Sequence, residues 1–167
     1  MAIIVQGALI GVLATFVIDV WALFVARVLR LPTANWALVG RWFGYLAHGR
    51  FVHHPVGNSA PIANERAIGW IAHYLTGIFY GVAYLGIVQG VLSAGPSFKS
   101  ALVFGLATLV APWLILQPGM GAGVFASRTP RPNVTRLVNV SMHVIFGISL
   151  YGAWLIMQTP SLSSVTR

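Results

Sequence analysis

Cysteine is absent from this sequence of 167 residues, and acidic side chains are nearly absent, since only Asp19 and Glu65 carry carboxylates. The lack of thiols excludes disulfides, iron–sulfur clusters, zinc–thiolate sites and cysteine nucleophiles. Two carboxylates cannot build a four-glutamate di-metal cluster, and a two-carboxylate glycosidase is disfavoured because Asp19 lies within an apolar run. Charged residues reach only 7%, against about a quarter in soluble domains.

Apolar residues take the place of the missing charges. They make up 57% of the chain and give it a mean hydropathy of +0.82. Four apolar runs are long enough to cross a bilayer, which takes about 20 residues. They span about 3–28, 67–92, 101–117 and 137–158, and all are rich in small residues that let membrane helices approach closely. We therefore expect an all-α polytopic membrane protein with four transmembrane helices in a single domain over 1–167.

The basic residues divide unequally between the loops. Eight of them lie in or beside the first and third loops: Arg27, Arg30, Arg41, Arg50, Arg66, Arg128, Arg131 and Arg136. Lys99 and Arg167 lie on the other side. The positive-inside rule then predicts that the first and third loops are cytoplasmic and that both termini are outside. The first run is too long for a cleavable signal peptide and lacks a positive segment before it, so we expect it to be a retained span.

Two loops carry patterns of their own. The first, about 30–66, interleaves aromatic and polar residues between Asn35 and Phe51, which predicts a helix lying in the membrane interface or a shallow re-entrant segment. The third begins with a glycine-rich segment, 118–123, that lacks the Lys-Ser/Thr of a phosphate-binding loop. We expect irregular backbone there, with Arg128 and Arg131 near a lipid phosphate. Membrane lipids are thus the expected partners of the basic residues, and nucleic acid is not.

An internal repeat relates about 3–92 to about 101–158. His73 and Gly77 align with His143 and Gly147 at an offset of 70, and the order of the matching residues is the same in both halves. The motif Leu-Ala-Thr ending at Thr15 recurs in the third run. Two spans per repeat give both halves the same orientation, as in parallel-repeat transporters. The expected architecture is therefore two parallel two-helix repeats.

Three ionisable residues lie within the spans: Asp19, His73 and His143. Such residues are costly in a bilayer and usually face the bundle interior, so we expect one polar pocket in the cytoplasmic half. Together with Glu65 they are candidate acid–base residues. Glu65, Arg41 and Arg50 are expected at the mouth of this pocket. Asp19 has two interpretations: a proton-relay or ion-site carboxylate, or a polar contact to His73 or Thr108.

Two histidines on facing helices, each followed one turn later by a glycine, also match the needs of a b-haem site. In that hypothesis Gly77 and Gly147 give the macrocycle clearance, and Arg66 and Arg136 hold the propionates. The alternative is that both histidines are neutral and hydrogen-bonded locally. Asp19 is then the partner of His73, with Asn139 or Ser141 the partner of His143.

Three further histidines, His48, His53 and His54, lie within seven residues of the first loop. Imidazoles at this density are candidate ligands for a metal such as zinc. Their spacing matches no established zinc motif. The alternative is that they are interfacial residues near lipid headgroups.

The chain resembles a family of small bacterial inner-membrane proteins classed as a domain of unknown function. The resemblance rests on five short motifs: Ala14-Thr15 with Asp19, Gly40-Arg41-Trp42, Glu65 with Gly69-Trp70 and His73-Tyr74, Pro118-Gly119-Met120-Gly121, and His143 with Gly147. It covers nearly the whole chain and implies a four-span fold and an inner-membrane location. It implies no activity and no catalytic residue.

Four classes of function fit these patterns. The first is a site for a lipophilic cofactor or substrate such as b-haem or a quinone. The second is a membrane-embedded enzyme acting on a lipid or isoprenoid, which predicts an apolar groove beside the polar pocket. The third is a small transporter or channel-like oligomer, favoured by the parallel repeat and the intramembrane acid. The fourth is an accessory subunit whose exposed apolar surface is covered by a larger membrane complex.

Overall fold

The computed structural model describes residues 3–158, in which every regular element is helical. Four helices are long and apolar enough to cross a membrane: Ile3–Arg27, Glu65–Val91, Phe98–Gly119 and Pro132–Gln158. The predicted all-α fold with four candidate spans is therefore confirmed. Arg167, one of the two basic residues assigned to the outer side, lies outside the described residues.

Six α-helices and four short helical segments make up residues 3–158. The α-helices are α1 (Ile3–Arg27), α2 (Trp36–Leu46), α3 (Glu65–Leu85), α4 (Phe98–Ala107), α5 (Gln117–Gly119) and α6 (Pro132–Gln158). The short segments are η1 (Val56–Asn58), η2 (Gly86–Val91), η3 (Pro112–Leu116) and η4 (Val124–Ala126). The wider π-helical turns of η2 continue α3, and those of η3 join α4 to α5.

The third span differs from the prediction in its regularity and its end. It is interrupted after α4, resumes as the π-helical η3 at Pro112, and continues through α5 to Gly119. Proline has no backbone N–H and clashes with the preceding turn, so it commonly interrupts an α-helix. The span ends at Gly119, slightly beyond the expected end at about residue 117.

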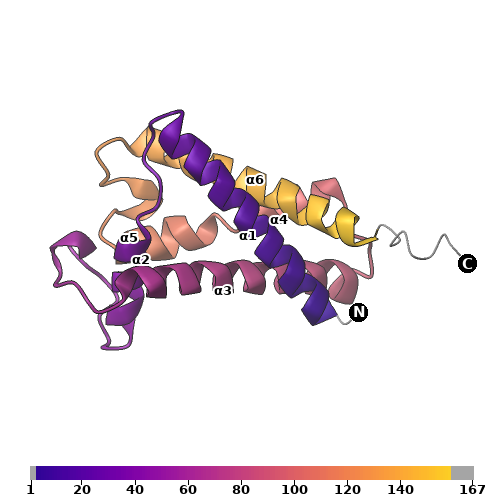
Figure 1. The fold of residues 1–167 in the computed structure, drawn as a ribbon, viewed down its shortest axis with the longest axis horizontal. Coiled ribbons are helices and arrows are strands. Elements are labelled where there is room, and N and C mark those ends of the chain that lie inside the picture. The colour runs from indigo at the N-terminus through magenta and orange to yellow at the C-terminus, as the bar shows by residue number, and fades with distance from the viewer. Residues whose placement is uncertain (1–2, 159–167) are drawn as a thin grey trace, which may run out of the picture.

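The spans follow one another in space in the order α3, α1, α6, α4. Helix α1 packs against both α3 and α6, and α6 packs against α4, whereas direct contact between α3 and α4 is sparse. Figure 1 shows α1 running obliquely across α3, with α6 beside α4. The four spans thus form a chain of helix pairs, and α3 and α4 meet mainly through long side chains such as Tyr84 and Phe104.

Glycines form the crossing of α1 and α3. A side chain at Gly81 would meet the carbonyl oxygen of Gly7, and one at Gly11 would meet that of Gly77. Backbones this close are typical of membrane helices that pack through small residues.

The crossing of α4 and α6 has the same character. A Cβ atom at Gly105 would lie 2.6 Å from the carbonyl oxygen of His143, and one at Gly147 would lie 2.7 Å from that of Ala101. Both helix pairs therefore depend on positions without side chains. The repeat itself stays a prediction, since the structure also differs between the halves: α2 occurs only in the first, and α4 is interrupted where α1 is continuous.

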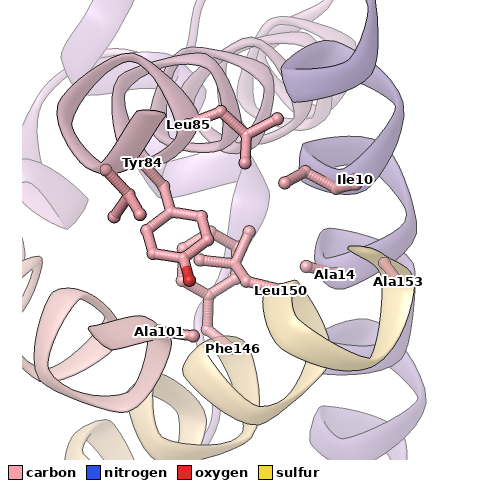
Figure 2. Close-up of a cluster of buried hydrophobic side chains, with 9 residues drawn as sticks. Ile10, Ala14, Tyr84, Leu85, Ala101, Phe146, Leu150 and Ala153 are labelled. Carbon is pink, nitrogen blue, oxygen red and sulfur yellow. The ribbon is translucent and has the colours of Figure 1, made fainter. Parts of the chain in front are cut away.

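A buried apolar cluster joins the four spans toward the end of the bundle where α3 ends and α4 begins. Figure 2 shows Tyr84 and Leu85 of α3 directed toward Ile10 of α1 and Leu150 of α6. The phenol oxygen of Tyr84 lies 3.0 Å from Oγ of Ser100, so its one polar atom is satisfied. This cluster fixes the relative positions of the helices that carry the ionisable residues.

Helix α2 occupies the first loop and packs along α3. It begins where the side chain of Asn35 accepts hydrogen bonds from the backbone N–H groups of Ala37 and Leu38, which is a standard N-cap. Gly40 contacts the carbonyl of Glu65 so closely that a side chain there would overlap it. A helix was expected in this loop, and α2 supplies it. Its position in the membrane interface stays a prediction.

Candidate functional site

The crossing of α1 and α3 brings Asp19 and His73 together. Nε2 of His73 lies 2.9 Å from Oδ1 of Asp19, and the hydroxyl of Tyr74 donates to Oδ2 at 2.8 Å. The side chains of His73 and Asp19 are 14% and 18% exposed. Both carboxylate oxygens are therefore engaged. The interpretation of Asp19 as the local partner of His73 is confirmed.

Aromatic rings surround the imidazole of His73. Trp36, the first residue of α2, stacks on it with ring centroids 4.0 Å apart and an interplanar angle of 30°. Trp70 meets the same imidazole edge-on at 5.8 Å and lies 5.4 Å from Trp36. Asp19, Trp36, Trp70, His73 and Tyr74 are called the His73 cluster below. In it the imidazole is fixed by a carboxylate at one edge and an indole over one face.

Three members of this cluster were not predicted from the sequence. Trp70 and Tyr74 entered only as parts of a family motif, although Tyr74 is the direct neighbour of His73 in the sequence. Trp36 is one of the aromatic residues between Asn35 and Phe51 and was given no role of its own. Its position beside His73 depends on how α2 docks on α3, for which the sequence holds no periodic signal.

The arrangement can handle a proton in two ways. When Asp19 is ionised and the imidazole carries both protons, Nδ1 of His73 is a donor. When the imidazole is neutral and keeps its proton on Nε2, Nδ1 is an acceptor. Nδ1 makes no hydrogen bond within residues 3–158. One ring nitrogen of His73 is thus held by the protein, and the other is free to change its role.

His143 has a different environment. Its Nδ1 lies 2.8 Å from the Thr108 hydroxyl and 3.2 Å from the Gly105 carbonyl oxygen. The Thr108 hydroxyl donates its own proton to the Gly105 carbonyl at 2.6 Å. In the hydrogen bond between His143 and Thr108, the proton is therefore carried by Nδ1 of His143. His143 therefore bonds to α4, and no hydrogen bond joins it to Asp19 or His73 in the described chain. The expected meeting of all three residues is not found.

The two local partners expected for His143 are engaged elsewhere. Asn139 accepts from the indole of Trp113 at 3.2 Å and from the amide of Gln117 at 2.8 Å. Ser141 accepts from the indole of Trp21 at 3.1 Å. These contacts connect α6 to α1 and to the third span.

The residues proposed for b-haem do not fit that cofactor. Nε2 of His73, the usual iron ligand, is occupied by Asp19. The glycines leave no clearance for a macrocycle, because Gly77 faces Thr15 and Gly147 faces Ala101 at helix contacts. Among the candidate propionate ligands, Arg136 donates to the carbonyl of Phe125 and to Asn133, while Arg66 is exposed. We derive no haem chemistry from this site.

Glu65 forms a two-bonded ion pair with Arg41. Nε and Nη2 of Arg41 donate to the two carboxylate oxygens of Glu65 at 2.8 and 2.9 Å. Nη1 of Arg41 also donates to the backbone carbonyls of Ser59 and Gly57. The bond to Glu65 raises the pKa of Arg41 further above its ordinary value. This pair fixes the first loop against α3, so both oxygens of Glu65 are occupied by structural contacts.

Arg50, also expected at the pocket mouth, lies over the ring of Tyr45 at 5.3 Å.

The three loop histidines do not gather into one site. His48 is exposed and its Nδ1 lies 3.1 Å from the Gly44 carbonyl, His54 is exposed, and His53 is fully buried. Within residues 3–158 no group of three His, Asp or Glu side chains is close enough to hold a metal ion.

His53 instead connects the first loop to the end of the third span. Its backbone N–H donates to the Gly119 carbonyl at 2.9 Å, and its Nδ1 lies 2.8 Å from Oγ of Ser59. The N–H of Val56 donates to Met120 at 2.9 Å beside this contact. Burial, followed by the nearby charge of Arg50, lowers the pKa of His53 from its ordinary value.

Two open apolar grooves lie on the outer side of α3. The larger, about 470 Å³, is lined by α3 residues between Ile68 and Tyr80, including Ala72 and Thr76, and by Phe43 of α2. The smaller, about 280 Å³, lies between α3 and α4. They share Phe79 and Tyr80, so they adjoin. Ala72 and Thr76 are close neighbours of His73 on α3, although the imidazole itself is not part of the groove wall.

A family model described as "Protein of unknown function (DUF2938)" matches residues 8–157, and the chain therefore belongs to this family. The resemblance noted from the sequence motifs is confirmed in that respect. No curated protein and no solved structure matches the chain significantly. The family description assigns no activity.

Proposed function

We propose that this member of the DUF2938 family binds a membrane-soluble quinone at the His73 cluster. The observation that carries the proposal is the imidazole of His73, whose Nε2 lies 2.9 Å from Asp19 while its Nδ1 has no partner in the described chain. The cluster belongs to two of the four candidate membrane helices and to the helix that caps them. A ligand that reaches it from the bilayer is lipophilic.

The hydrogen-bonding capacity of His73 suits both forms of a quinone. A quinone carbonyl accepts a hydrogen bond, and a quinol hydroxyl donates one. In the doubly protonated imidazole, whose Nε2 donates to Asp19, Nδ1 can donate to the carbonyl. In the neutral imidazole, Nδ1 can accept from the hydroxyl. The proposal concerns binding alone and requires no electron-transfer partner.

The surroundings of the imidazole favour a flat ring with a long apolar tail. Trp36 and Trp70 supply aromatic faces beside His73, and aromatic pairs contribute about 0.5–1.5 kcal/mol beyond the area that they bury. The larger groove starts at neighbouring positions of α3 and is apolar. Its volume of about 470 Å³ lies in the range of roughly 300–1,000 Å³ usual for ligand sites. It offers a place for an isoprenoid tail.

Quinone binding can be measured directly on the protein reconstituted into lipid nanodiscs. Because the cluster contains two tryptophans, titration with a short-tail ubiquinone should quench part of the tryptophan fluorescence in a saturable way. His73→Gln and Asp19→Asn should each raise the Kd about tenfold or more, since a hydrogen bond to a charged group contributes roughly 1.5–3 kcal/mol. His48→Gln, at an exposed loop histidine, is the matched control and should leave the Kd unchanged.

Two results would contradict the proposal. One is quenching that does not saturate with quinone concentration. The other is a Kd for His73→Gln equal to that of the unsubstituted protein while both proteins are folded by circular dichroism.

We also propose that the His73 cluster faces the cytoplasmic leaflet of a bacterial inner membrane. The support is the excess of arginine in the first and third loops. Because the chain has no cysteine, single cysteines at His48 and Lys99 can be labelled selectively in intact cells. A membrane-impermeant maleimide should label Lys99→Cys and not His48→Cys, and the opposite pattern would reverse the topology.

A further inference from the structure

A short turn between the third and fourth spans is held in one conformation by its own hydrogen bonds. Phe125 and Ala126 adopt left-handed backbone angles, with φ of 51° and 56°, which L side chains rarely adopt. Nε of Arg136 donates to the Phe125 carbonyl at 2.8 Å, and the Thr129 hydroxyl donates to the Ala126 carbonyl at 2.8 Å. These two hydrogen bonds compensate for the unfavourable left-handed backbone conformation of Phe125 and Ala126.

The result of this conformation is an exposed apolar edge. Val124 and Phe125 are 48% and 43% exposed, while Ala126 is fully buried beneath them. The ring of Phe125 rests on Trp113 with centroids 5.0 Å apart. The turn lies between Gly119 and Pro132, which end and begin two candidate spans. The exposed apolar pair therefore lies between the ends of two candidate spans.

Basic side chains flank this apolar edge without an acidic partner. Arg128 and Arg131 are exposed, and neither makes an ion pair in the described chain. The only two carboxylates of the sequence are engaged with other residues, Asp19 with His73 and Glu65 with Arg41. The positive charge of the turn is therefore not neutralised by the protein.

We propose that Val124, Phe125, Arg128 and Arg131, here called the Phe125 patch, form a docking surface for an anionic phospholipid. A guanidinium group binds the phosphate of a headgroup through paired hydrogen bonds. The apolar pair contacts the upper part of the acyl chains. A lipid with net negative charge fits better than a zwitterionic one, whose ammonium group offsets the phosphate. This patch is separate from the His73 cluster and does not depend on the proposed quinone site.

Native mass spectrometry can test the lipid preference on the full chain. The protein is released from micelles that contain equal amounts of phosphatidylglycerol and phosphatidylcholine, and the ratio of the two retained lipids is counted. The unsubstituted protein should retain phosphatidylglycerol preferentially. The double variant Arg128→Gln/Arg131→Gln should reduce the ratio roughly 25-fold, since each basic residue near an anionic surface contributes about a fivefold preference. Phe125→Ser should reduce total lipid retention without inverting the ratio.

The matched control is Arg27→Gln/Arg30→Gln, which removes the same charge from two exposed arginines at the end of α1. It should retain most of the preference. An equal loss in the control would mean that net charge alone determines the preference, and this would overturn the docking surface. An unchanged ratio in the Arg128/Arg131 variant would overturn it as well. Displacement of phosphatidylglycerol by millimolar inorganic phosphate would show a site for the free ion instead of the lipid.

Discussion

His73 and His143 are equivalent in the predicted repeat, yet the two halves of the molecule use them differently. His73 is paired with a carboxylate through Nε2 and is stacked beneath Trp36. His143 is bonded through Nδ1 to a hydroxyl and a backbone carbonyl. The first half thus pairs its histidine with a carboxylate, and the second pairs its histidine with a hydroxyl and a backbone carbonyl. Similar helix crossings support two different chemistries.

The cause of this difference lies on the helix that faces each histidine, about one turn beyond the threonine of the repeat. Asp19 follows Thr15 by about one turn on the unbroken helix α1. The corresponding position of the third span is Ala111 or Pro112, where the regular helix is interrupted. No carboxylate is available there, and the side chain that bonds to the imidazole of His143 is the Thr108 hydroxyl. The Thr15 hydroxyl bonds only within its own helix, to Gly11.

Both halves share a helix crossing that packs through glycine, and larger side chains at these glycines should destabilise it. Gly81→Leu and Gly105→Leu each place a side chain against the backbone of a facing helix and should lower the free energy of unfolding by about 3 kcal/mol or more. Gly152→Leu on α6 is the control, because its position has open space around it. Unfolding in mixed micelles measures the effect. Equal stability of all three variants would contradict glycine-mediated crossings.

The chemical difference between the halves can be tested by double-mutant cycles. Asp19→Asn combined with His73→Gln should give a coupling energy of about 1–2 kcal/mol, because the two residues share a hydrogen bond. Asp19→Asn combined with His143→Gln should be additive within about 0.5 kcal/mol. A coupling to His143 as large as that to His73 would restore the single three-residue pocket expected from the sequence.

The two threonines of the repeat, Thr15 and Thr108, should differ by a smaller amount in their contribution to stability. Thr108→Val removes a hydroxyl that bonds to both His143 and Gly105, and it should destabilise the protein by about 1 kcal/mol. Thr15→Val removes a bond within one helix and should cost less, about 0.5 kcal/mol. Thermal unfolding of the two variants in the same detergent gives the comparison. The reverse order would mean that His143 does not depend on Thr108.

The smallest expected effect concerns the loop contact that joins the first half to the end of the third span. Because burial lowers the pKa of His53 from 6.5, protonation favours the undocked loop, and docking should weaken as the pH falls below about 6.5. Hydrogen exchange at the amides of His53 and Val56 should accelerate in that range. His54→Gln, at an exposed neighbour, should keep this pH dependence, and His53→Gln should remove it.

Much of the architecture could be predicted from hydropathy alone. The four spans follow from the length and spacing of apolar runs, and the helix in the first loop follows from its interleaved aromatic and polar residues. Both are local features of the sequence. The interruption at Pro112 was not predicted, although proline within a helical run is a recognised signal for one. The expected end of the third span was accordingly about two residues short.

The site was predicted only in part, since its geometry depends on contacts between elements. The pairing of Asp19 with His73 was anticipated because both are costly in a membrane and must find polar partners. The stacking of Trp36 on His73 requires α2 to fold back on α3, and the burial of His53 requires the loop to dock on Gly119. Neither contact leaves a periodic trace in the sequence. The separation of His143 from Asp19 depends on the rotation of α6, which the sequence pattern leaves open.

The most direct test of the quinone site is a nuclear magnetic resonance titration of the histidine ring nitrogens. The protein, labelled with ¹⁵N at histidine and reconstituted in nanodiscs, is titrated with a short-tail ubiquinone, with His73→Gln and His143→Gln used for assignment. We predict that the Nδ1 resonance of His73 shifts in a saturable way while both ring nitrogens of His143 stay unchanged. A shift confined to His143, or none at either histidine, would contradict the proposal that the first half of the molecule holds the binding site.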